Sequence, residues 1–167
     1  MVDTTIEQCI ESFPHPSFTK QEGEHTYDKI QTTNKLSETN AKSGDTTRDR
    51  GQHGHLALVL NTNAYNTLIG QIFMPPANPV PVPVIAGNTR SSQVAAPENA
   101  HKERLKERNE NKAVGKALIQ LTTNAFGEKH LRHLKKRHTR LSNVTVLQVF
   151  EHLCNTCVNV TVRTDRK

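Results

Sequence analysis

The sequence contains no tryptophan, two tyrosines and five phenylalanines, so aromatic residues make up only 4% of its 167 positions. Hydrophobic residues account for 34%, below the roughly 45–50% apolar content of ordinary globular domains. Any core must therefore be small and built mainly from aliphatic side chains. We expect such a core to support one domain of about 100 residues, and not an ordered body along the whole chain.

Three cysteines are too few and too scattered to form a disulfide framework. The N-terminus lacks the basic region and the following apolar stretch of a secretory signal. The longest weakly polar run, residues 72–87, contains five prolines and cannot form a membrane helix. We therefore expect an intracellular protein of the cytoplasm or nucleus that has no membrane partner.

The motifs of several common enzyme classes are also missing. The chain has no Gly-x-Ser-x-Gly, no phosphate-binding loop, no His-Glu-x-x-His and no Asp-Thr/Ser-Gly signature. The acidic residues lie mainly in the polar N-terminal half, away from any apolar segment that would shift their pKa. We expect no enzymatic activity, no cofactor and no small-molecule substrate.

Positive charge is concentrated on one short segment. Residues 1–50 carry 6 basic and 9 acidic side chains, whereas residues 128–141 carry 6 basic and 1 acidic. A cluster of this kind either binds phosphates in a salt-dependent, sequence-independent way or forms a solvated surface without a partner. The candidate RNA-binding residues are Lys129, Arg132, Lys135, Lys136, Arg137 and Arg140.

Two apolar stripes at steps of three and four residues predict two amphipathic helices, and the fold class is therefore all-α. Gly127 is a plausible left-handed residue at which the first helix ends. The stripes are expected to form the core, and part of one stripe could serve self-association instead. They comprise Val114, Ala117, Leu118, Leu121, Ala125 and Phe126 in the first helix, and Val146, Leu147, Val149, Phe150 and Leu153 in the second.

The chain divides into four parts at residues 1–50, 51–87, 88–158 and 159–167. The first is expected to be mostly disordered, with a short helix over Thr4–Phe13, a second from a Thr26 N-cap, and a linker over residues 37–50. The second part contains a two-turn helix that is capped at Thr62 or Asn63 and ends at Gly70. One face of this helix carries Ala64, Tyr65, Leu68 and Ile69. A proline-rich extended arm follows it. The third is the helical core, whose first helix begins at Thr89 or Pro97, and the fourth is a tail.

Two sets of residues are weak metal candidates. His152, Cys154 and Cys157 supply three zinc-type ligands, with His133 or His138 as a fourth, but on an apolar helix the cysteines are better read as small core residues. His53 and His55 flank a glycine and could bind a metal ion. We favour a role in which they orient the turn before Leu56 by hydrogen bonding.

Several short motifs occur in an order that resembles the Gag-like polyprotein of Copia-type LTR retrotransposons. The resemblance covers roughly residues 26–158, and each motif is weak without the others. The matching pieces are His53–Leu56, Ala64–Tyr65, Phe73–Gly87, Val114–Leu121, His130–Thr139, Asn143–Thr145 and His152–Leu153.

This resemblance implies a small capsid-like helical domain that self-associates into particles and contacts RNA through its basic segment. The partners would be further copies of the chain and RNA, bound weakly and without sequence preference. Two alternatives stay open: a small basic nucleic-acid-binding module that does not assemble, and a zinc-stapled regulatory domain that uses His152, Cys154 and Cys157.

Overall fold

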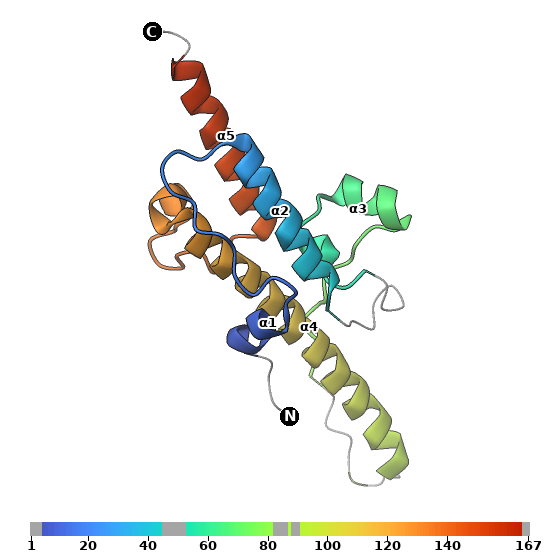
Figure 1. Ribbon diagram of the computed structural model, residues 1–167. Coiled ribbons are helices and arrows are strands. Elements are labelled where there is room, and N and C mark those ends of the chain that lie inside the picture. The colour runs from blue at the N-terminus through green and yellow to red at the C-terminus, as the bar shows by residue number, and fades with distance from the viewer. Residues whose placement is uncertain (1–4, 45–52, 82–86, 88–90, 165–167) are drawn as a thin grey trace.

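The computed structural model describes residues 5–44, 53–81, 87 and 91–164, with the side chains of residues 91–95 and 159–164 excepted. Helices supply almost all of the regular structure in this part of the chain, which confirms the all-α prediction (Figure 1). The elements are α1 (Ile6–Ser12), α2 (Tyr27–Lys42), the 3-10 helix η2 (Leu56–Leu58), α3 (Thr62–Ile69), α4 (Ser91–Phe126), the 3-10 helix η3 (Glu128–Leu134) and α5 (Val146–Thr164).

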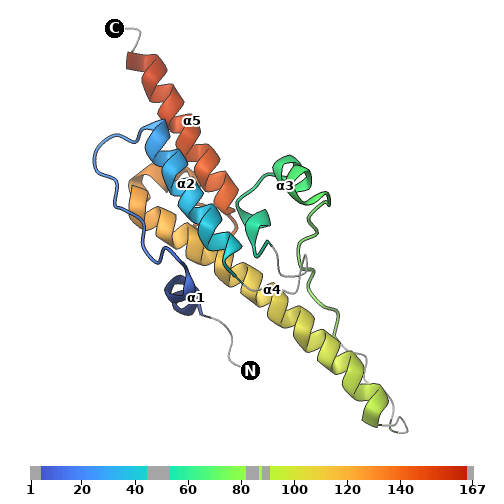
Figure 2. The same ribbon diagram turned by 45° about the vertical axis from the view of Figure 1, so that its right-hand side comes forward.

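The long helix α4 has an inner half that is buried and an outer half that projects from the body (Figures 1 and 2). It begins at Ser91 and continues through Pro97, so it starts between the two predicted positions. It ends where expected, because Gly127 has a φ of 82°. Every residue of the predicted stripe is buried: Val114, Ala117, Leu118, Leu121, Ala125 and Phe126.

Helix α5 covers the inner half of α4. Thr145 and Gln148 cap its start reciprocally, since each side chain accepts a hydrogen bond from the other's backbone N–H, at 3.2 and 3.0 Å. The predicted stripe is confirmed as core at four positions (Val146, Val149, Phe150 and Leu153), while Leu147 is only half-buried. The last turns of α5 extend beyond the body, at the end opposite the outer half of α4 (Figure 1).

Helix α2 packs against both α4 and α5, and it corrects two predictions. Thr26 is the N-cap, as expected, but the helix continues to Lys42, so the predicted linker was wrong over residues 37–42. The sequence also suggested that Tyr27 and Ile30 share one face of this helix, but Ile30 is buried and Tyr27 is 55% exposed. The buried face is largely polar, with Ile30, Thr33, Ser37, Asn40 and Ala41. Residues 45–50 of the predicted linker lie outside the described residues.

Asn40 shows how a polar side chain is accommodated in this face. Its amide oxygen accepts the N–H of His15 at 2.9 Å, and its amide nitrogen donates to the carbonyl of His15 at 2.8 Å. A buried amide that is paired in this way does not carry the free-energy penalty of an unsatisfied polar group. The chain after α1 is thereby fastened to α2.

Helix α1 forms as predicted, beginning two residues after the predicted start and ending one residue before the predicted end. Thr5 and Gln8 make a capping box at its start, and the helix lies against α4 with Cys9 and Phe13 buried. Together with α2, it gives the first 44 residues more packed structure than the composition suggested.

The segment His53–Leu56 joins α2 to α4 through His55, a link that the sequence did not predict. The predicted hydrogen-bonding role has support at His55, and no contact of the described residues supports it at the ring of His53. The N–H of His55 donates to the carbonyl of Ala41 at 2.7 Å, near the end of α2. The buried ring of His55 lies 3.4 Å from the amide nitrogen of Asn111 and 3.8 Å from a carboxylate oxygen of Glu110, both on α4. Between the two histidines, Gly54 has a φ of 55° and presses against the backbone of α2.

We expect Gly54→Ala to lower the free energy of unfolding by roughly 2–3 kcal/mol, because a left-handed alanine is strained. In addition, its Cβ would lie 2.6 Å from the carbonyl oxygens of Ala41 and Lys42. Gly23→Ala is the matched control, since Gly23 has a φ of 76° with no atom within 4 Å of a new Cβ. Urea denaturation of both variants measures the difference, and equal losses would show that the close approach at Gly54 contributes nothing.

Helix α3 and the proline-rich arm lie on one side of the body. Asn61 caps α3, one residue before the predicted caps, and Gly70 ends it with a φ of 77° as expected. Of the predicted apolar face only Tyr65 is buried, and its ring contacts Phe73 edge-on at 5.6 Å. Residues 73–81 then run without regular secondary structure toward the outer half of α4, and residues 82–86 of the predicted arm lie outside the described residues.

Candidate nucleic-acid interface

The basic segment forms a compact corner between α4 and α5. Its first half is η3, and its second half is a tight turn closed by an antiparallel bridge between Lys136 and Arg140. Their backbone hydrogen bonds measure 3.0 and 2.9 Å. Arg140 has a φ of 48°, so the turn contains a non-glycine residue in the left-handed region. We call residues 128–141 the basic corner.

Buried aliphatic side chains hold the basic corner against the core. Leu131 is fully buried, and Leu134 is partly buried against the same core. His152 of α5 adds a polar contact, with its Nε2 3.0 Å from the carbonyl oxygen of His130. Because the backbone is anchored from the inside, the intervening charged side chains are directed outward.

Of the six predicted RNA-binding residues, one has an intramolecular partner. Lys135 forms an ion pair with Glu128 at 2.5 Å, and its hydrogen bond and charge lower the pKa of the Glu128 carboxyl group. The five other side chains are exposed: Lys129, Arg132, Lys136, Arg137 and Arg140. Five cations therefore surround one anchored corner, and Lys135 helps to shape it.

His25 lies at the inner edge of the basic corner and was not identified from the sequence. Its ring contacts Phe126 at 4.9 Å and His130 at 4.1 Å. Burial lowers the pKa of His25, as does the charge of His130, with smaller contributions from Lys29 and Lys129. A backbone hydrogen bond at Phe126 opposes the shift. Burial also lowers the pKa of His130.

These shifts predict that stability falls on mild acidification. Below a pH of about 6.5 the histidines of the unfolded chain bind protons, while burial keeps His25 and His130 of the folded chain neutral. The free energy of unfolding therefore falls as the pH decreases, until the lowered pKa values of the folded chain are passed. We expect a lower Tm at pH 5.5 than at pH 7.5, and a smaller difference in His25→Phe. His101→Phe, on the outer half of α4, is the control. A wild-type Tm that does not change between these pH values would contradict the prediction.

The zinc candidates each have protein partners. Cys157 Sγ donates to the carbonyl oxygen of His25 at 3.1 Å, and Gln31 Nε2 lies 3.8 Å from Cys154 Sγ. Burial raises the pKa of Cys154, which disfavours the thiolate that zinc requires. Among the described residues, no three or more His, Cys, Asp or Glu side chains are arranged to hold a metal ion. Both cysteines pack against the core, as the helix interpretation predicted.

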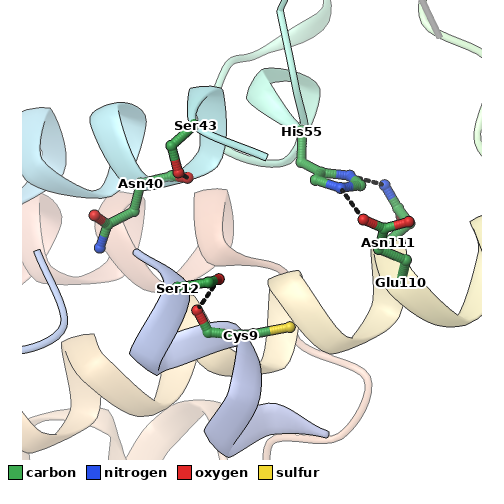
Figure 3. Close-up of polar contacts among 7 residues, drawn as sticks. All are labelled: Cys9, Ser12, Asn40, Ser43, His55, Glu110 and Asn111. Carbon is green, nitrogen blue, oxygen red and sulfur yellow. Dashed lines mark hydrogen bonds and ion pairs between the residues drawn. The ribbon is translucent and has the colours of Figure 1, made fainter. Parts of the chain in front are cut away.

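A second group of polar side chains meets where α1, α2 and α4 converge with His55 (Figure 3). Burial and the charge of Glu110 raise the pKa of Cys9, so its thiol stays protonated and is a weak nucleophile. The hydroxyls of Ser12 and Ser43 donate to backbone carbonyls of their own helix or its last turn, at 2.8 and 2.7 Å. These two hydroxyl contacts are local to α1 and α2, and the contact between elements is that of His55 with Asn111 and Glu110 of α4.

None of the described helices has the length and apolar character needed to cross a membrane. The chain matches no protein-family model, no curated protein and no solved structure. The assignment of a function consequently depends on the geometry of the basic corner and on the order of motifs in the sequence.

Proposed function

We propose that this protein is a structural, Gag-like capsid protein that binds RNA at its basic corner and associates with further copies of itself. The observation that supports RNA binding is the anchored corner, where Lys129, Arg132, Lys136, Arg137 and Arg140 surround a short stretch of backbone. Cations held in this way bind phosphates without reading bases, because the corner contains no Phe, Tyr or Trp side chain for base stacking.

Self-association, in this proposal, uses surfaces other than the two apolar stripes. Ten of the eleven residues in the two stripes are buried within one chain, among them Val114, Leu118, Leu121, Phe126, Phe150 and Leu153. Leu147 is half-buried. Particle formation would therefore result from several weak contacts, some of them mediated by RNA that bridges basic corners.

A basic RNA-binding module that does not assemble is the second candidate, and the burial of both stripes favours it. Sedimentation velocity of the full chain with single-stranded RNA, at about 50 and 300 mM salt and two protein concentrations, separates the two. Assembly predicts large species that increase with protein concentration. A chain that remains monomeric and only releases RNA at high salt would overturn assembly and retain RNA binding.

A further inference from the structure

Histidines gather at the basic corner. The chain has nine histidines, and five of them lie within the corner or against it: His25, His130, His133, His138 and His152. The ring centroids of His25 and His130 are 4.1 Å apart, and those of His133 and His152 are 6.2 Å apart. An imidazole changes from neutral to cationic between about pH 8 and pH 5. The charge of this surface can therefore change near neutral pH, which lysines and arginines alone would not allow.

Three of the five histidines are half-buried and hold the corner in place: His25, His130 and His152. Burial lowers the pKa of His25 and of His130, so mild acid leaves both rings neutral. His152 Nε2 lies 3.0 Å from the carbonyl oxygen of His130. A carbonyl oxygen only accepts, so this nitrogen carries the hydrogen. These three rings join the corner to α5 and to the chain that enters α2.

The other two histidines, His133 and His138, are exposed. His133 directly follows Arg132 in η3. His138 directly follows Arg137 in the turn that the bridge between Lys136 and Arg140 closes. Consecutive Cα atoms are about 3.8 Å apart, and charges act over roughly 10 Å at 0.1 M salt. Each exposed imidazole therefore lies within range of a phosphate that the preceding guanidinium attracts.

The groups around the two exposed rings leave room for an added positive charge. Glu128 is the only acidic residue of the corner, and it is paired with Lys135. Residues 117–126 of α4 carry no titratable side chain. His152 lies beside His133, so protonation of both rings is opposed unless an RNA phosphate offsets the repulsion. The other titratable groups on the adjoining segments are Lys20, Glu22, Glu24, Asp28 and Lys29 before and in α2, and Glu151, Cys154 and Cys157 on α5.

We propose that His133 and His138 are further RNA-binding residues of the basic corner, and that they contact phosphates in their protonated form. This inference rests on the proposed function, because it adds two titratable cations to the same surface. Binding of RNA then takes up protons, so the affinity for RNA rises as the pH falls. In mild acid the site has up to seven cations, namely the five exposed lysines and arginines and these two histidines.

The test measures binding of the full chain to a single-stranded oligouridylate, whose bases stay uncharged, at about pH 7.5 and pH 6.0 and about 50 mM salt. We expect the wild-type chain to bind about three- to tenfold more tightly at the lower pH. The slope of log K against log salt concentration should also become steeper by up to about 1.4, since each phosphate contact contributes about 0.7. The double variant His133→Gln with His138→Gln should lose both changes and bind RNA at pH 7.5 as the wild type does.

The matched control changes two histidines that lie away from the corner, His15→Gln with His101→Gln. The backbone of His15 is bonded to Asn40, near the opposite end of α2, and His101 lies on the outer half of α4. This variant should keep the full pH dependence, which separates the corner histidines from an overall rise in positive charge. Circular dichroism at both pH values checks that the helices of each variant are retained.

Two results would overturn the role of the exposed histidines and leave RNA binding at the corner intact. One is a wild-type affinity that is the same at both pH values. The other is a pH response that the control variant loses to the same extent as the variant of His133 and His138. A chain that binds no RNA at either pH would overturn the proposed function as well.

Discussion

Replacing Leu118 with alanine is expected to lower the free energy of unfolding by about 3–5 kcal/mol. The side chain is 0% exposed and lies in the middle of the buried stripe of α4. Its removal forfeits the transfer free energy of the lost methyl groups and leaves a cavity that the surrounding helices fill only in part. Because small domains are stable by only about 5–15 kcal/mol, this loss is a large fraction of the total, and the variant should unfold at a clearly lower temperature.

Leu105→Ala provides the matched control for this prediction. Leu105 lies on the outer half of the same helix and is 37% exposed, so its truncation should change stability by about 0.5 kcal/mol. Chemical denaturation followed by helical circular dichroism measures both variants. Equal losses would contradict the division of α4 into a packed inner half and a solvated outer half.

The second large effect concerns the five cations of the basic corner that are available for RNA. Changing Lys129, Arg132, Lys136, Arg137 and Arg140 together to alanine is expected to weaken binding to single-stranded RNA roughly 100-fold at about 50 mM salt, because the variant cannot release the counterions that these side chains displace. Stability should change little, since all five side chains are exposed.

The control variant removes the same number of positive charges elsewhere. Lys102, Arg104, Lys106, Arg108 and Lys112 lie on the outer half of α4, and their change to alanine keeps the net charge equal to that of the corner variant. A filter-binding comparison then separates local geometry from total charge. If both variants lose the same affinity, the basic corner has no special role.

The strongest features of the fold could be predicted from the sequence because they depend on local signals. The apolar stripes of α4 and α5 follow the helical period, and the caps at Thr26, Gly70 and Gly127 use side chains or backbone conformations that act within a few residues. Burial of the stripe then follows from the hydrophobic effect, whatever the neighbouring elements are.

The second half of α2 could not be predicted in the same way. Ser37 and Asn40 are fully buried, yet their polarity resembles that of a linker. What makes burial of Asn40 acceptable is its pair of hydrogen bonds with the backbone of His15, 25 residues away. No local pattern predicts such a partner, because it exists only after the helices pack.

The cations of the basic corner are exposed, which agrees with a positive surface, but the internal contacts of the corner were not foreseen. The excess of cations over residues 128–141 indicated a positive surface, whereas the pairing of Lys135 with Glu128 depends on how η3 and the turn fold back. His25 contributes a ring to the same corner from a distant part of the chain, among acidic neighbours that gave no indication of this contact.

The salt dependence of single-stranded RNA binding is the most direct measurement of the central claim. Each phosphate contact contributes about −0.7 to the slope of log K against log salt concentration, so five cations predict a slope as steep as about −3.5. We expect a slope between about −2 and −3.5 for the wild-type chain, and a much shallower one for the five-alanine corner variant. A wild-type slope near zero, or one that the corner variant leaves unchanged, would contradict RNA binding at the basic corner.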